Sequence, residues 1–287
     1  MANLKEIRSR IVSVSSTMQI TSAMKMVSAA KLKKAQDAIT AMRPYSEKLT
    51  ELLQNLSATL DGDTGGAFAE QRPVNKVLIV AITSNRGLCG AFNSNVIKQV
   101  KALQESYAGK QVDVLAIGKK GNDVLKKIAN VTDNKSSLFD ALTFENVAAI
   151  AQTLMDKFAA GEYDKIELVY NHFKNAATQV VLTEQFLPLK PVEASKESTV
   201  ATDYIFEPGK EEIVLSLIPL SLKTQLYKAV RDSFASEHGA RMTAMHKATD
   251  NATELRNQLK LTYNKARQAA ITGEILEIVG GANALAG

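Results

Sequence analysis

The sequence LKEIRSRIVSVSSTMQITSAMKMVSAAKLKKAQDAITAM occupies residues 4–42 and contains neither glycine nor proline. Its apolar residues recur at alternating steps of three and four from Leu4 onward, which is the spacing of a coiled-coil seam. The same steps continue to Leu60, and residues 1–61 hold a single proline. Such a repeat predicts a helix of roughly 85 Å, longer than one small domain needs. Segment 1–61 therefore needs a long partner helix.

The carboxyl-terminal segment 209–287 supplies that partner. Few glycines or prolines interrupt it, and a second heptad seam runs through it. The seam residues are Met245, Ala248, Ala252, Leu255, Leu259, Thr262, Ala266 and Ala269. Because half of them are alanine, two helix axes can approach closely, which favours a thin two-helix shaft. The sequence predicts a long coiled coil of segments 1–61 and 209–287.

The middle segment, residues 62–208, changes character after the turn residues DGDTGG at 61–66. Short apolar, β-branched runs alternate there with amphipathic helical patterns. The predicted strands are 77–83, 112–118, 165–173 and 179–189, the predicted helices are 92–107, 122–128 and 143–161, and the predicted linker is 191–208. This alternation indicates a Rossmann-like α/β domain with a mostly parallel sheet, in which 179–189 is an antiparallel hairpin strand.

Composition excludes several classes of protein. A chain of 287 residues with 45% hydrophobic content has room for two structural units, and no apolar run is long enough to span a membrane. The start MANLKEIRSRI lacks the apolar core of a secretory signal, which favours a cytosolic chain. The single cysteine, Cys89, excludes an internal disulfide. We expect no metal and no cofactor, since His238 and His246 lie two helical turns apart and cannot share an ion.

The segment SNRGLCGAFNSN (84–95) follows the first predicted strand and opens a helix, the position at which nucleotide-binding sheets hold phosphate. It lacks both the lysine of a Walker loop and the GxGxxG spacing. The interpretation we favour is a tight turn that needs Gly87 and Gly90. A thiol nucleophile at Cys89 beside Arg86 is the alternative, although no histidine neighbours it in sequence. No catalytic residues are predicted.

Positive charge is concentrated on segment 1–34, where seven basic residues accompany one acidic residue, although the whole chain carries a net charge of +5. Such a surface attracts an acidic protein, a nucleic acid or lipid headgroups. The seam of this segment has three polar positions, Thr21, Lys25 and Ser28. Two interpretations stay open: a stutter in the supercoil, and a part of the shaft that faces other proteins.

Four segments resemble the gamma-subunit family of the F-type ATP synthases. They are QITSAMKMVSAAKLKKAQ (19–36), SNRGLCGAFNSN (84–95), SEHGARMTAMHKATDNATEL (236–255) and LTYNKARQAAITGEILEIVGGANAL (261–285). Their order and spacing cover essentially the whole chain, and the last segment is the most specific. The resemblance implies that the two terminal helices form an antiparallel coiled coil inside a ring of alternating alpha and beta subunits.

By this resemblance the chain is a non-catalytic rotor, the central stalk of a rotary motor. It would couple proton-driven rotation of the membrane c-ring to conformational change at the catalytic beta subunits, and the reverse during ATP hydrolysis. The implied partners are the alpha and beta subunits, the epsilon subunit and the c-ring. The implied location is the cytoplasmic face of the bacterial inner membrane, with membrane association only through the complex and no nucleic acid bound.

The resemblance also implies three groups of contact residues. Met24, Lys25 and Arg241 would meet an acidic lever of a beta subunit. Residues of the glycine loop would lie near the bottom of the beta subunits; they are Arg86, Gly87, Cys89 and Gly90. A catch region would bond loops of the ring; it comprises Arg267, Gln268, Thr272 and Glu274. Gly273 departs from the family pattern, since a longer side chain is usual there.

Two other classes of function remain as alternatives from the residues alone. A nucleotide-utilising enzyme built on the α/β domain predicts nucleotide binding by the isolated chain. A basic coiled-coil adaptor predicts salt-sensitive binding to DNA or RNA, but aromatic residues make up only 6% of the chain. Neither alternative accounts for two long helices at opposite ends of the sequence.

Overall fold

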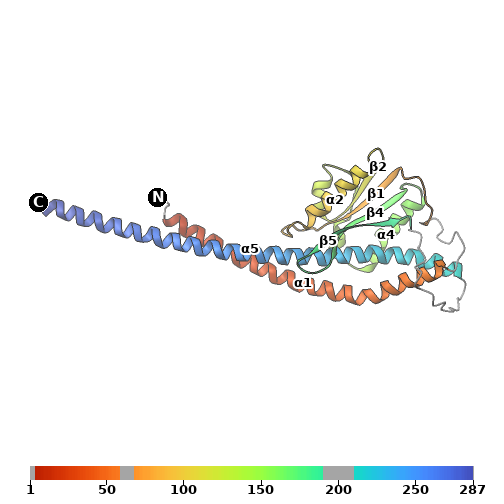
Figure 1. The fold of residues 1–287 in the computed structure, drawn as a ribbon, viewed down its shortest axis with the longest axis horizontal. Helices are drawn as coiled ribbons and strands as arrows, with labels where there is room; N and C mark the ends of the chain where they lie inside the picture. Colours follow the sequence, from red (N-terminus) through yellow and green to blue (C-terminus); the bar gives the residue numbers. More distant parts are fainter. Residues whose placement is uncertain (1–3, 59–67, 190–209, 287) are drawn as a thin grey trace. The chain divides into compact units, whose positions relative to one another are not determined.

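The computed structural model describes residues 4–58, 68–189 and 210–286 (Figure 1). The predicted boundary at 61–66 and the predicted linker 191–208 lie outside these residues. The chain divides into two compact units. The first combines Met1–Ser28 with Met242–Gly287, and the second is Ala29–Arg241. The division predicted from sequence, 1–61, 62–208 and 209–287, follows chain order instead and stays a prediction.

Two long helices account for the terminal segments. Helix α1 spans Leu4–Ala58 and helix α5 spans Lys210–Ala286, as the seams predict. In the first unit the hydroxyls of Thr21 and Thr249 lie 2.8 Å apart, and Arg256 contacts the sulfur of Met18 at 3.6 Å. Because the residue number falls on α1 as it rises on α5, the two helices are antiparallel. Figure 1 shows them side by side in this unit.

Two of the three polar positions of the first seam, Thr21 and Ser28, are buried, whereas Lys25 is half-buried. Thr21 is only 8% exposed and Ser28 is 3% exposed. Met26 and Val27, by contrast, are 66% and 57% exposed. The hydroxyl of Ser28 is satisfied within the helix by the carbonyl of Met24 at 2.8 Å, which makes its burial tolerable. The seam therefore continues through Thr21 and Ser28 as buried polar positions, while the apolar Met26 and Val27 are exposed.

A five-stranded sheet forms the centre of the second unit. Its strands are β1 (Lys76–Ile82), β2 (Gln111–Ile117), β3 (Asn130–Asn134), β4 (Lys165–Phe173) and β5 (Gln179–Leu187). Their order is β3-β2-β1-β4-β5, and only β5 is antiparallel to its neighbour. The mostly parallel sheet and its antiparallel hairpin confirm the predicted fold class. Strand β3 was not predicted, because its sequence NVTDN contains no apolar run.

Helices cover both faces of this sheet. On one face lie α2 (Phe92–Ser106) and α3 (Lys119–Leu125), whose Val96, Val100 and Leu125 pack against β1 and β2. On the other face, α4 (Phe144–Ala159) and the first part of α5 share a second cluster, with a 3-10 turn, η2 (Ser136–Asp140), beside them. The strand β1 is buried along nearly its whole length because both faces are covered.

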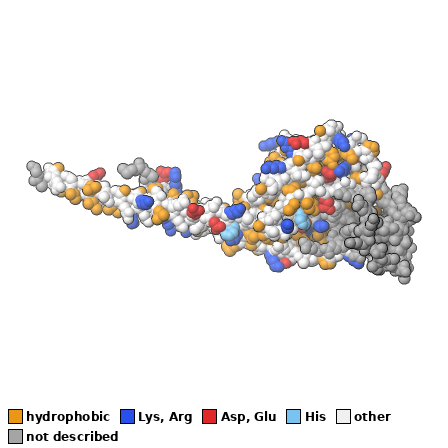
Figure 2. Space-filling view, in the orientation of Figure 1, with side chains coloured by type: hydrophobic (Ala, Val, Ile, Leu, Met, Phe, Trp, Pro, Cys, Tyr) orange, Lys and Arg blue, Asp and Glu red, His pale blue; other side chains and the backbone are white. Residues whose placement is uncertain are grey.

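The carboxyl-terminal part of α5 carries exposed apolar side chains (Figure 2). They include Leu261, Ile271, Ile275, Leu276, Ile278 and Val279. Contiguous apolar surface on a protein marks a site of contact with another molecule. Among the helices of the described residues, none combines the length and hydropathy that crossing a membrane requires.

Candidate functional site

The glycine loop, residues 84–90, connects β1 to α2 as a tight turn. The backbone N–H of Ser84 donates to the Oδ1 of Asn93 at 3.0 Å, and the Ser84 hydroxyl donates to the carbonyl of Arg86 at 2.7 Å. Leu88 has a φ of 63° and Gly90 a φ of 59°. The left-handed region suits glycine but disfavours leucine, so surrounding contacts must hold Leu88 in place. The predicted tight turn agrees with this geometry at Gly90. The predicted need for glycine at position 87 does not, because Gly87 has no positive φ and an added Cβ there would meet only Lys120 at 3.9 Å.

Arg241 of α5 binds the loop from inside the second unit. Its Nη2 donates to the carbonyl of Arg86 at 3.0 Å, and its Nε and Nη2 both lie 3.3 Å from the carbonyl of Gly87. Its Nη1 pairs with a carboxylate oxygen of Glu237 at 2.7 Å. Arg241 is only 6% exposed. A buried arginine is stable only when its donors are matched in this way.

Two neighbours on α5 complete a buried ionisable cluster. Burial raises the pKa of Glu237, and the charge of Arg241 opposes that shift. Burial lowers the pKa of His238 to about 3, with Arg241 and Lys31 adding to the effect. The His238 ring meets Phe234 edge to face at 4.5 Å, and its Nε2 has no hydrogen-bond partner among the described residues. His238 is therefore neutral at physiological pH.

Cys89 lies on the inner side of the loop. It is buried in a small cluster with Phe92 and Ala240, and its sulfur accepts a hydrogen bond from Asn93 Nδ2 at 3.3 Å. Burial is the main reason that its pKa is raised. A thiol with a raised pKa stays protonated and is a poor nucleophile. The structure therefore gives no support to the alternative of a reactive Cys89.

The outer side of the loop is formed by different residues. Arg86 and Gly90 are exposed, and Leu88 is 64% exposed at the tip. Leu88 was not among the predicted contacts, and its exposure depends on the positive φ that the sequence does not reveal. Glu237 was also missed, although its spacing of four residues before Arg241 is a recognisable signal for a helical ion pair.

The other predicted site residues lie in the first unit. Met24 and Lys25 are half-buried on α1. The catch region is exposed along α5; its residues are Arg267, Gln268, Thr272 and Glu274. The structure thus brings Arg241 together with the glycine loop, whereas Met24, Lys25 and the catch region belong to the other unit.

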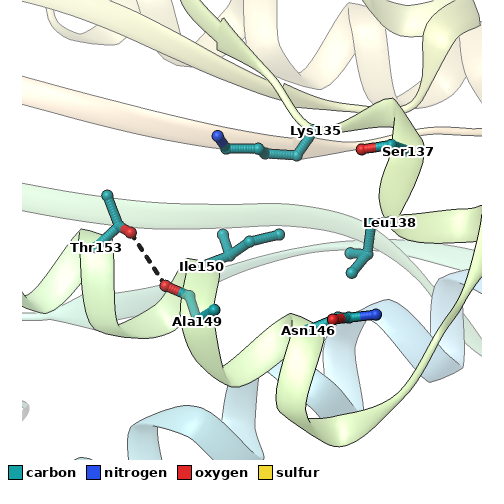
Figure 3. A pocket seen from close by; sticks show the side chains of 7 residues that line it. All are labelled: Lys135, Ser137, Leu138, Asn146, Ala149, Ile150 and Thr153. Atoms are coloured by element: carbon teal, nitrogen blue, oxygen red, sulfur yellow. Dashed lines mark hydrogen bonds between the residues drawn. The ribbon is translucent and has the colours of Figure 1, made fainter.

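A shallow pocket of about 330 Å³ lies between η2 and α4 (Figure 3). Three of its polar side chains are engaged within the chain: Lys135 pairs with Asp133 at 2.7 Å, the Thr153 hydroxyl donates to the carbonyl of Ala149 at 3.0 Å, and Asn146 donates to the carbonyl of Ala141 at 2.8 Å. Nowhere in the described residues do three or more His, Cys, Asp or Glu side chains gather as a metal site would need. The lining of the pocket does not resemble a catalytic site.

Comparisons with known proteins agree with this arrangement. The family model described as ATP synthase matches residues 3–285. The ATP synthase gamma chain of Flavobacterium psychrophilum is 80% identical, and that of Christiangramia forsetii is 66% identical, each over all of both chains. A chain in the structure of the Euglena gracilis mitochondrial ATP synthase, OSCP/F1/c-ring, has a TM-score of 0.71 and 25% identity, covering 98% of this chain and 94% of that one. This chain belongs to the family of ATP synthase gamma chains.

Proposed function

We propose that this chain is the rotating central shaft of an F-type ATP synthase, coupling rotation of a proton-driven c-ring to conformational change at catalytic beta subunits. The observation that carries the proposal is the antiparallel pair of long helices, α1 and α5, in a chain that matches gamma chains over its full length. A gamma chain is a non-catalytic subunit. The cluster around Arg241 agrees with that role, because its charges bind one another and the backbone.

Coupling follows from symmetry. A single asymmetric shaft inside a threefold ring presents a different surface to each beta subunit, so each catalytic site has a different affinity for nucleotide. Turning the shaft exchanges these affinities among the sites. Because coupling free energy is reciprocal, nucleotide binding and release at the ring must also drive the shaft.

The shaft surface offers side chains for such contacts. Met24 and Lys25 are the proposed contacts with an acidic lever of a beta subunit, and the exposed Met26 and Val27 next to them add apolar area. The four residues of the catch region are exposed and can hydrogen-bond loops of the ring; they are Arg267, Gln268, Thr272 and Glu274. In the glycine loop, the exposed Arg86, Leu88 and Gly90 and the half-buried Gly87 are the proposed contacts. The predicted contact Cys89 is buried and supports the turn from within.

The proposed partners are the alpha, beta and epsilon subunits and the c-ring. The similar chain from Euglena gracilis belongs to an assembly of OSCP, F1 and c-ring, and this likeness supports partners of the same kind here. We place the complex on the cytoplasmic face of a bacterial inner membrane, because the highly identical relatives are bacterial. The chain would then reach the membrane only through its partners.

Reconstitution tests the proposal. Purified alpha and beta subunits of the Flavobacterium psychrophilum enzyme are mixed with this chain, which is 80% identical to the native gamma chain. A stable complex whose ATPase activity depends on the added chain is expected. Active alpha and beta subunits that gain nothing from this chain, and form no complex with it, would overturn the proposal.

A further inference from the structure

Arg241 donates hydrogen bonds to the backbone of the glycine loop, which is distant in sequence. Three hydrogen bonds of 3.0 to 3.3 Å join its guanidinium to the carbonyls of Arg86 and Gly87, which precede it by more than 150 positions. Every residue has a backbone carbonyl, so these bonds depend on the position of the loop backbone and not on the side chains that the loop carries. Glu237 neutralises the guanidinium from one helical turn away.

The same stretch of α5 is fastened to the sheet at other points. The Ser236 hydroxyl donates to the carbonyl of Asn171 at 3.0 Å, and Asp232 lies 2.6 Å from the Nδ1 of His172. Gly239 allows the turn at Ala176 to approach so closely that an added Cβ would lie 3.3 Å from its carbonyl oxygen. These contacts hold β4 and its hairpin. Among the described side chains of α5, Arg241 is the one that hydrogen-bonds the glycine loop.

The backbone of the glycine loop is in an unfavourable conformation at Leu88. Leu88 stands at its tip with a φ of 63° and is 64% exposed. A leucine in the left-handed region persists only where its surroundings determine the backbone, and an exposed side chain receives little help from packing. The carbonyls bound by Arg241 are those of the two residues immediately before Leu88.

Arg241 itself has little surface to offer a partner. It is 6% exposed, and its Nη1, Nη2 and Nε all have acceptors within the second unit. A residue that met a partner directly would keep at least one donor directed outward. Arg241 therefore holds the loop in position, whereas the exposed Arg86 and Leu88 are the residues available to a partner.

We propose that Arg241 is a positioning residue, which locks the glycine loop onto α5 so that Arg86 and Leu88 are presented to the ring as a rigid surface. This inference rests on the proposed function, and it replaces the expected direct contact between Arg241 and a beta subunit. The loop then moves with α5 as one body, so force on its tip passes to the shaft without bending the loop.

The test compares two readouts in the assembled ATP synthase. Arg241→Gln removes the charge and most of the donors, Arg241→Lys keeps the charge but not the fork of donors, and Arg231→Gln is the matched control. Arg231 lies on the same helix and donates to the carbonyl of Leu142 at 3.1 Å, away from the glycine loop. Two quantities are measured for each variant. The first is amide hydrogen exchange at the N–H groups that hydrogen bonds of the loop protect, those of Ser84, Phe92 and Lys120, and the second is the ratio of protons pumped to ATP hydrolysed.

We expect Arg241→Gln to speed exchange at these N–H groups by about tenfold, as loss of hydrogen bonds to a charged group predicts, and to lower the coupling ratio. Arg241→Lys should fall between Gln and wild type, and Arg231→Gln should leave both readouts unchanged. A lower coupling ratio with unchanged loop exchange would show that Arg241 acts by direct contact and would overturn the inference. Faster exchange with full coupling would overturn it too.

Two safeguards keep the outcome interpretable. If Arg241→Gln fails to assemble, Arg241→Lys alone decides, because the same two readouts must then change together. Failure of the proposed function has a different signature, since the wild-type chain itself would give no complex and no coupled ATPase activity. A wild-type chain that couples, with variants that show no link between loop exchange and coupling, refutes only the positioning role.

Discussion

The hydroxyl of Thr249 on α5 lies 2.8 Å from the hydroxyl of Thr21 on α1, and it bridges the two helices inside a seam that is otherwise largely apolar. Each hydroxyl also has a carbonyl of its own helix within reach, Met245 for Thr249 and Met18 for Thr21. Either threonine can therefore lose the other without leaving a buried polar group unsatisfied. The bridge should therefore contribute no more than the modest net free energy of one hydrogen bond.

Replacing Thr21 and Thr249 by valine, singly and together, should show that the two residues interact. We expect a coupling free energy of about 0.5 to 1.5 kcal/mol, the usual net value of one hydrogen bond. The measurement is a double-mutant cycle from urea unfolding of the purified chain. Thr17→Val is the control, because exposed Thr17 bonds only the carbonyl of Ser13 within α1. Additive effects of the two valines would contradict the prediction.

Two glycines of α5 should respond oppositely to larger side chains. A Cβ on Gly273 would meet no atom within 4 Å, so Gly273→Ala should stabilise the helix by about 0.5 to 1 kcal/mol. A Cβ on Gly239 would lie 3.4 Å from Phe173 and 3.3 Å from the backbone of Ala176. Gly239→Leu should therefore destabilise by about 1 to 3 kcal/mol through overpacking. Thermal unfolding followed by circular dichroism measures both changes, and the same sign for both would refute this account.

The turn after β2 has a stricter requirement for glycine. Gly118 has a φ of 120°, and a Cβ there would lie 2.3 Å from the carbonyl oxygen of Thr83. Gly118→Ala should destabilise the second unit by about 3 kcal/mol or more, since strain and a backbone clash act together. Gly109→Ala is the control for strain alone, because its φ is also positive but nothing lies within 4 Å of the added Cβ. Equal losses in urea unfolding for the two variants would argue against the clash.

Stability should depend on the protonation of His238. Its folded pKa of about 3 lies below the ordinary value of 6.5, so in this interval the unfolded chain binds a proton that the folded chain does not. Stability from neutral His238 is present above pH 6.5 and is lost as the pH falls toward 3. The charges of Arg241 and Lys31 both oppose protonation of the His238 ring. The raised pKa of Glu237 has the opposite effect on the pH dependence of stability, and this effect is present in wild type and in any variant that retains Glu237.

The variant His238→Gln isolates this dependence. The free energy of unfolding of wild type minus that of the variant should fall by as much as about 1.4 kcal/mol per pH unit below pH 6.5. The measurement is urea unfolding of both chains at several pH values from 7.5 to 4, chosen to bracket the expected window. A difference that does not change with pH would mean that His238 is not buried in its neutral form.

The sequence was most informative where one physical signal dominates. Apolar periodicity located α1 and α5. A continuous apolar run located β1, because a strand buried on both faces needs one. Thr143 was expected to start a helix, and its hydroxyl does accept from the N–H of Asn146 at 3.3 Å. Local rules of this kind need no knowledge of the rest of the chain.

Contacts between distant residues could not be predicted in the same way. Thr21 and Ser28 looked like a break in the seam, since burial of a hydroxyl depends on a partner that periodicity does not reveal. Strand β3 is an edge strand whose alternating exposure lets polar residues occupy it. The hydrogen bonds between Arg241 and the glycine loop join residues more than 150 positions apart, and only the fold brings them together.

Direct observation of rotation tests the central claim. The chain is assembled with alpha and beta subunits fixed to a surface, and a bead or gold particle is attached to a cysteine that replaces the exposed Lys174, after strand β4, in a Cys89→Ser background. The account predicts that ATP turns the particle in one direction in three steps per revolution, set by the threefold ring. A stable, ATP-hydrolysing complex in which the particle does not turn would contradict it.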